Sequence, residues 1–158
     1  MSQDVLIRPD QFGEYDLEFE DADFSSAEGF ETAIAVSLFT DARAPASSVP
    51  DPLKRRGWIG NVLEPDLTFE LGGLLWLFEQ SRLTPEILNR VRLAARGSLQ
   101  WLIDDGAARE VEVTAVQPDL RGIRVSIRIT GLDNDVNQFS VLWRRTDAFK
   151  LSSVSRSV

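Results

Sequence analysis

The side chains of this sequence that could do acid–base chemistry are carboxylates, because the chain contains no histidine and no cysteine. The absence of histidine and cysteine excludes Ser-His-Asp and Cys-His catalysis and the usual His/Cys zinc sites. Glycoside hydrolysis needs only two carboxylates about 5–9 Å apart, one with a raised pKa. Candidates are Glu64, Asp66, Glu70 and Glu79. Because the chain has 25 Asp and Glu residues, some pair always fits this spacing, and the pattern only weakly indicates an enzyme.

Two further motifs could be ligand sites. The run Leu71-Gly72-Gly73-Leu74 lacks the spacing and the lysine of a phosphate-binding loop. The cluster Asp133-Asn134-Asp135 offers too few ligands for a calcium loop and is interpreted as a turn. We therefore predict no cofactor, no metal and no catalytic residue.

The most unusual run is Lys54-Arg55-Arg56-Gly57-Trp58-Ile59-Gly60-Asn61, which follows a proline-rich loop over residues 42–52. The two glycines favour a tight backbone path, and Trp and Arg are enriched at interface hot spots. One interpretation is therefore a partner-binding loop. The other is a buried tryptophan that anchors the loop, preceded by a solvated basic run. The residues do not decide between them.

Charge is unevenly distributed along the chain. Residues 1–41 contain eleven acids and one base, whereas residues 42–158 contain sixteen bases and fourteen acids. The acidic arm, residues 1–24, argues against nucleic-acid binding, which needs clustered Lys and Arg. It suits docking onto a basic protein surface, or it only keeps the protein soluble. We also expect no membrane span and no secretory signal, because no long apolar stretch and no suitable N-terminal segment is present.

The elements that position these residues are organised around one long amphipathic helix, predicted over residues 84–106. Thr84 is the expected N-cap, Pro85 suits the first helical position, and Gly106 suits a left-handed end. Apolar residues recur at three-and-four spacing and predict a buried stripe; they are Ile87, Leu88, Val91, Ala94, Ala95, Leu99, Leu102 and Ile103. Asp104 and Asp105 in its last turn are either solvated or bind a basic partner.

Two more helices and an N-terminal strand are expected before this helix. Alternation over residues 15–20 predicts a half-buried strand. Residues 25–28 have the form of a capping box, which predicts a helix that ends near residues 40–41. The apolar run over residues 71–80 predicts a buried helix.

After Gly106 the apolar period changes to two. Strands are predicted over residues 110–115, 123–129 and 139–145, with a Ser-rich, flexible tail at 147–158. Glu110 and Glu112 should meet Arg124 and Arg128 across the first hairpin. The sequence therefore predicts a single α+β domain over residues 1–158: an N-terminal strand and three main helices packed on a C-terminal antiparallel β-meander.

The order of several motifs resembles a known family. The motifs are Gly29-Phe30-Glu31-Thr32-Ala33-Ile34-Ala35-Val36-Ser37-Leu38-Phe39-Thr40-Asp41, Arg56-Gly57-Trp58-Ile59-Gly60-Asn61, Leu75-Trp76-Leu77, Thr84-Pro85-Glu86-Ile87-Leu88 and Leu102-Ile103-Asp104-Asp105-Gly106. Over about residues 15–130 the chain resembles the Mu-like phage baseplate family. That family is related to the baseplate wedge protein that initiates the tail sheath of contractile tails, in the lysozyme-like baseplate wedge superfamily.

This resemblance implies a non-catalytic structural protein of the virion baseplate, assembled in the host cytoplasm. Six copies are expected around the tail tube. Its partners would be the baseplate wedge proteins and the tail sheath protein, with the tail tube or spike hub as further candidates. The sheet would offer a free edge to the first sheath ring, by β-augmentation.

The resemblance also suggests which residues contact partners. The wedge-binding candidates are Arg55, Arg56, Trp58, Asp104, Asp105 and Arg109, and the sheath-binding candidates are Phe139, Val141, Trp143, Arg144 and Arg145. Wider relatives have an acidic-Pro-Arg signature after the long helix, and here the acids and Arg109 are present without the proline. Two alternatives from other classes are a peptidoglycan-degrading, lysozyme-like tail enzyme that uses a carboxylate pair, and an adaptor of unrelated machinery.

Overall fold

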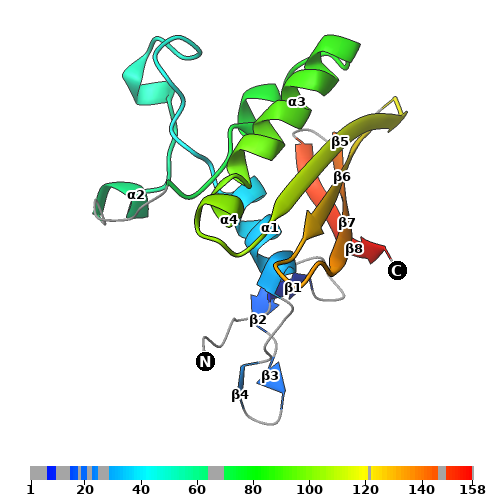
Figure 1. The fold of residues 1–158 in the computed structure, drawn as a ribbon. Coiled ribbons are helices and arrows are strands. Elements are labelled where there is room, and N and C mark those ends of the chain that lie inside the picture. Colours follow the sequence, from blue (N-terminus) through cyan, green and yellow to red (C-terminus); the bar gives the residue numbers. More distant parts are fainter. Residues whose placement is uncertain are drawn as a thin grey trace.

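The protein is an α+β fold in which helices cover one face of an antiparallel sheet (Figure 1). The computed structural model describes residues 7–9, 15–17, 19–20, 23–24, 29–63, 70–120, 122–145 and 149–157, with side chains for 30–63, 70–120 and 122–143. The sheet has four strands in the order β5-β6-β7-β8. Their bounds are β5 (Glu110–Asp119), β6 (Gly122–Thr130), β7 (Val136–Arg145) and β8 (Phe149–Ser157).

The predicted alternation in the sheet is confirmed. Every second side chain of β6 is buried, and the register sets Ile127 opposite both Val113 and Phe139. Since successive side chains of a strand point to opposite faces, these residues form one apolar face under the helices. The buried sheet residues are Val111, Val113, Ile123, Val125, Ile127, Ile129, Phe139, Val141 and Trp143.

The structure at the end of the chain differs from the sequence prediction. A three-stranded sheet with a flexible tail is the expectation from sequence, but residues 149–157 form a fourth strand that pairs along β7, with Val154 opposite Val141. The sequence does not predict this strand, because its serines weaken the apolar period of two. The strand forms by backbone pairing with the preceding strand β7, and composition alone does not reveal that pairing. Residues 147–148 and 158 of the predicted tail lie outside the described residues.

The long central helix is divided in two. Helix α3 (Pro85–Ser98) begins as predicted, with the Thr84 hydroxyl accepting a hydrogen bond from the N–H of Ile87 at 3.2 Å. The helix ends at Leu99, and α4 (Trp101–Asp104) follows after a turn. This change of direction allows Trp101 to donate to the Ser37 hydroxyl at 2.9 Å. Gly106 has the predicted left-handed φ of +74°.

The N-terminal half differs more from expectation. Helix α1 (Gly29–Phe39) ends where predicted, while the capping box over 25–28 lies outside the described residues. The single strand expected over residues 15–20 is instead two short strands in separate hairpins. Strand β1 (Ile7–Pro9) pairs with β2 (Tyr15–Leu17), and β3 (Phe19–Glu20) pairs with β4 (Asp23–Phe24).

The helix predicted over residues 71–80 is only one 3-10 turn, η2 (Leu75–Phe78). Gly72 has a φ of +116°, and a Cβ there would lie 2.7 Å from the Thr40 carbonyl oxygen. Gly73 forms a parallel bridge with Asp41. The two glycines therefore allow the backbone of residues 72–73 to pack closely against the backbone of residues 40–41. The apolar run alone does not indicate this contact.

Candidate functional site

The segment over residues 42–63, called the arm below, projects from the helical side of the fold (Figure 1). It contains η1 (Pro52–Lys54) and α2 (Gly60–Leu63). Its first end is tied to the body, since the N–H of Ala42 donates to the Gly73 carbonyl at 2.9 Å. Its second end is tied by Asn61, whose side chain donates to the Leu71 carbonyl at 2.8 Å and accepts from the Leu71 N–H at 3.0 Å. The arm is thus a closed loop with a fixed base.

Arg56 joins the arm to the body. Its guanidinium donates to Asp41 at 3.0 Å and to both carboxylate oxygens of Glu79 at 3.1 and 3.2 Å. It also lies 4.7 Å from the centre of the Trp76 ring. The hydrogen bond to Glu79, followed by that to Asp41, raises the pKa of Arg56 above its ordinary value. The geometry is that of an intramolecular clamp with two acids and one aromatic face.

Arg55 is also used within the chain. Its guanidinium donates to the carbonyls of Val49 and Pro50 at 2.8 and 2.9 Å. Arg43 adds bonds to the carbonyls of Pro52 and Arg56. The predicted wedge-binding arginines therefore shape the arm. Whether they also contact a partner stays a prediction.

Trp58 matches neither sequence interpretation completely. Its side chain is not buried in the core, because 42% of the residue is exposed. Its ring lies against Gly60, where an added Cβ would come within 2.2 Å of it. The ring is therefore held on the surface of the arm, which pre-organises it for contact with another molecule.

Further exposed apolar residues of the arm are not predicted from the sequence. Leu53 is 93% exposed and Val62 is 74% exposed, and Ile59 and Leu63 are each 68% exposed. We call Leu53, Trp58, Ile59, Val62 and Leu63 the arm cluster. The three-and-four spacing of residues 59, 62 and 63 was the available signal. Several large apolar side chains on one projecting segment indicate an interaction surface.

The second group of predicted wedge residues lies at the turn between α4 and β5. Asp104 accepts a hydrogen bond from the Gln100 side chain at 2.8 Å, and Asp105 is exposed. Arg109 donates to the Asn134 side chain in the turn between β6 and β7. Among the described residues, neither aspartate forms an ion pair with Arg109. The acids are therefore solvated in the isolated chain.

The predicted sheath-binding strand is not a free edge. Strand β7 lies between β6 and β8, so both of its sides are paired. Phe139, Val141 and Trp143 are buried under the helices, and the side chains of Arg144 and Arg145 lie outside the described set. Among the described strands, β5 and β8 are the outer strands of this sheet, each with one paired side.

Of the four carboxylates considered for catalysis, Glu70 and Glu79 lie within the described residues. Glu79 is bound to Arg56, Glu70 is exposed, and Glu64 and Asp66 lie outside the described residues. The part of the chain that the structure describes contains no group of three or more metal-ligating side chains. Asp133-Asn134-Asp135 forms the predicted turn, in which the Asp133 carboxylate accepts from the N–H of Asp135 at 3.1 Å. None of the helices among the described residues has the length and apolarity needed to cross a membrane.

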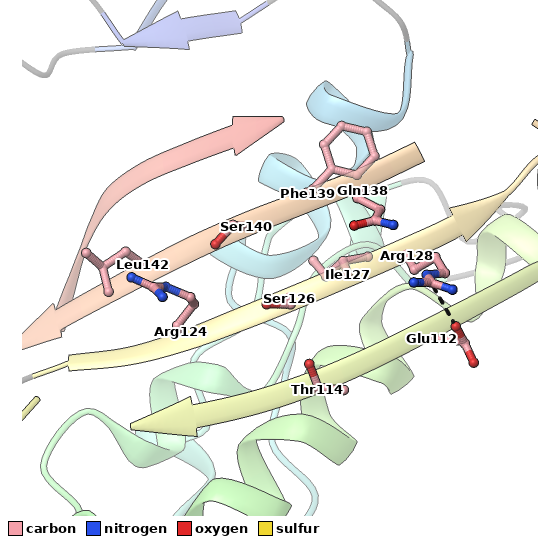
Figure 2. A pocket seen from close by; sticks show the side chains of 10 residues that line it. All are labelled: Glu112, Thr114, Arg124, Ser126, Ile127, Arg128, Gln138, Phe139, Ser140 and Leu142. Atoms are coloured by element: carbon pink, nitrogen blue, oxygen red, sulfur yellow. Dashed lines mark ion pairs between the residues drawn. The ribbon is translucent and has the colours of Figure 1, made fainter. Parts of the chain in front are cut away.

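The outer face of the sheet, opposite the helices, is hollowed (Figure 2). We call this hollow of about 730 Å³ the outer groove. Figure 2 shows the ion pair between Glu112 and Arg128, 3.7 Å long, which confirms one of the predicted cross-strand contacts. The described residues that line the groove come from β5, β6 and β7, and the side chains of two of them, Ile127 and Phe139, are buried on the helical face. The ten residues are Glu112, Thr114, Arg124, Ser126, Ile127, Arg128, Gln138, Phe139, Ser140 and Leu142.

Comparison with known proteins agrees with the resemblance found in the sequence. The Mu-like prophage FluMu protein gp46 of Haemophilus influenzae is 32% identical over 126 residues, which cover 80% of this chain and 86% of that protein. The Baseplate protein gp46 of Escherichia phage Mu is 31% identical over 126 residues, covering 78% and 85%. Residues 30–136, which include the arm, α3, α4, β5 and β6, match the family described as Phage protein GP46. The chain therefore belongs to the phage protein GP46 family of Mu-like phages.

Proposed function

We propose that this protein is a structural component of the baseplate of a contractile, Mu-like tail, where it joins the wedge and initiates the sheath. The observation that supports this most is the match to Baseplate protein gp46 of phage Mu over 85% of that protein. The structure adds an arm that is hydrogen-bonded at both ends and carries exposed apolar residues, which suits assembly better than catalysis.

The arm cluster is the proposed contact with the wedge. The base of the arm is closed by backbone and side-chain hydrogen bonds, so little conformational entropy is lost when a partner binds. Arg56 holds the cluster in place, and Asp104, Asp105 and Arg109 provide a second, polar contact at the turn between α4 and β5. This arrangement combines apolar anchors with a charged rim, as protein interfaces usually do.

The outer edge of β8 is the proposed contact with the sheath. Strand β5 carries devices that discourage edge pairing: Glu110 and Glu112, Pro118 and an irregular register between Val116 and Asp119. The middle of β8, residues 151–155, contains neither a charge nor a proline. An incoming strand therefore meets fewer obstacles at β8, which pairs with the strand over residues 139–145 that the resemblance suggested for sheath contact, and β-augmentation is proposed at this edge.

A particle-assembly assay tests the arm. The gene is replaced in a producing phage or lysogen by a variant with Ile59→Ser and Val62→Ser. Because both side chains are mostly exposed, the purified variant should keep its unfolding free energy within about 0.5 kcal/mol. Complete tails should be lost. Leu93→Ser, an exposed apolar residue on α3, is the matched control and should assemble. Normal tails with the Ile59/Val62 variant would refute the arm assignment.

A proline pair tests the β8 edge. Successive N–H groups of a strand point to opposite sides, so one of Ser153→Pro and Val154→Pro removes a bond to β7 and the other an outward donor. We expect one variant to be destabilised and the other to stay folded but block sheath addition in electron micrographs. If the folded variant still supports sheath, the β8 edge is not used.

A further inference from the structure

The outer groove has the chemistry of a binding surface for an acidic, extended polypeptide. Arg124 and Arg128 project from the same face of β6, separated by Ser126 (Figure 2). Arg128 is only loosely paired with Glu112, and Arg124 makes no ion pair within the described part of the chain. Hydroxyl and amide side chains fill the spaces between them. A groove with two cations and many hydrogen-bonding groups favours an anionic chain over an apolar one.

The acidic segment, residues 1–24, matches this groove in charge, and in spacing when residues 16–20 are extended as one strand. Residues 1–24 contain eight acids and one base. Asp16, Glu18 and Glu20 alternate with apolar residues in the sequence, and Asp16 and Glu20 belong to strands. At about 3.3 Å per residue, side chains four residues apart on an extended chain are separated by about 13 Å. Once bound as one extended segment, Asp16 and Glu20 would therefore have the same spacing as Arg124 and Arg128.

The described strands of the acidic segment do not lie over the groove of their own chain (Figure 1). Asp16 and Glu20 belong to β2 and β3, which Figure 1 shows below the sheet and not over its face. We propose that the outer groove binds the acidic segment, residues 1–24, of a second copy of this protein. Groove and segment are different surfaces, so the contact is head-to-tail, and such contacts generate rings when the rotation closes. The proposal concerns self-association of the purified chain and does not depend on the proposed baseplate role.

A charge-swap experiment tests the contact. The groove variant carries Arg124→Glu and Arg128→Glu, and the segment variant carries Asp16→Lys and Glu20→Lys. In low salt, sedimentation velocity should show self-association of the natural protein, weakened about tenfold or more in either variant. A 1:1 mixture should associate again, because the segment variant keeps the natural groove, the groove variant keeps the natural segment, and the reversed groove and reversed segment are also complementary. A natural protein that stays monomeric at millimolar concentration, or a mixture no stronger than its components, would overturn the proposal.

The matched control is Arg82→Glu with Arg90→Glu, two exposed arginines, one just before α3 and one within it. This variant has the same net charge as the groove variant and should associate like the natural protein. Equal weakening in the control would show that net charge alone is responsible, which also overturns the proposal.

Cysteine cross-linking distinguishes a second copy from the same chain, because the protein contains no cysteine of its own. Chains with Ser126→Cys and chains with Glu18→Cys should form a disulfide-linked heterodimer when mixed. Leu53→Cys, on the arm, should not link to Glu18→Cys. If a single chain that carries both Ser126→Cys and Glu18→Cys instead closes within the monomer at high dilution, the groove binds its own segment and the second-copy assignment is wrong. Absence of both links rejects the groove.

Discussion

Replacing Arg56 by alanine should loosen the arm and lower global stability by a predictable amount. The side chain forms ion pairs with Asp41 and Glu79, whose side chains are 41% and 25% exposed, and it stacks on Trp76. Partly exposed pairs contribute about 0.2–1 kcal/mol each, and the cation–π contact about 0.5–1 kcal/mol. We therefore expect a loss of about 1–3 kcal/mol in the free energy of unfolding, or roughly 2–12 °C in Tm for a chain of this size.

The assay combines denaturant unfolding with amide hydrogen exchange. Exchange should accelerate within residues 42–63 of the Arg56→Ala variant, because the clamp at the base of the arm is lost, and stay unchanged in β6. In about 1 M salt the difference from the natural protein should shrink, since the screening length falls to about 3 Å. The part that persists reports the contact with Trp76.

Two companion variants separate side-chain from backbone effects. Arg56 has a φ of +49°, which is unfavourable for a residue with a Cβ. Arg56→Gly should therefore be about 1 kcal/mol more stable than Arg56→Ala, although it lacks the same contacts. Arg92→Ala, on the exposed side of α3 with hydrogen bonds to the Asn89 side chain, should change stability by less than about 0.5 kcal/mol. If Arg56→Ala matched Arg92→Ala in stability and exchange, the clamp would have no energetic role.

Other expectations follow from local geometry. Gly72→Ala should cost about 1–3 kcal/mol, because its φ is +116° and the new Cβ would approach the Thr40 carbonyl oxygen to 2.7 Å; equal stability in thermal unfolding would contradict this. Gly97→Ala, in α3 with open space around it, should instead stabilise by about 0.5–1 kcal/mol, and a lower Tm would disagree. Thr84→Ala removes the acceptor for the N–H of Ile87 and should cost about 0.5–2 kcal/mol. Recovery of that loss by Thr84→Ser but not by Thr84→Val would identify the hydroxyl as its cause.

Short-range sequence patterns predict the local structure well where that structure depends on neighbouring residues. The N-cap at Thr84 and the left-handed Gly106 are readable because each depends on a few adjacent residues. The strands around Ile127 are readable because burial on one face imposes a period of two. The family motifs are likewise present in the linear order of residues, and the comparison with phage Mu confirms the family.

The tertiary structure decides which of these residues and strands contact one another. Arg56 and Glu79 are 23 residues apart in the chain, and nothing in the basic run itself distinguishes an intramolecular clamp from a partner-binding cation. The Ser-rich end of the chain becomes a strand because β7 offers it a row of backbone partners, and that pairing makes β8, in place of β7, an outer strand of the sheet. Local periods, caps, charge asymmetry and family membership are thus written in the order of residues. The long-range pairings, the exposure of the arm cluster and the position of the outer groove are not, because their energies depend on contacts between residues far apart in the chain.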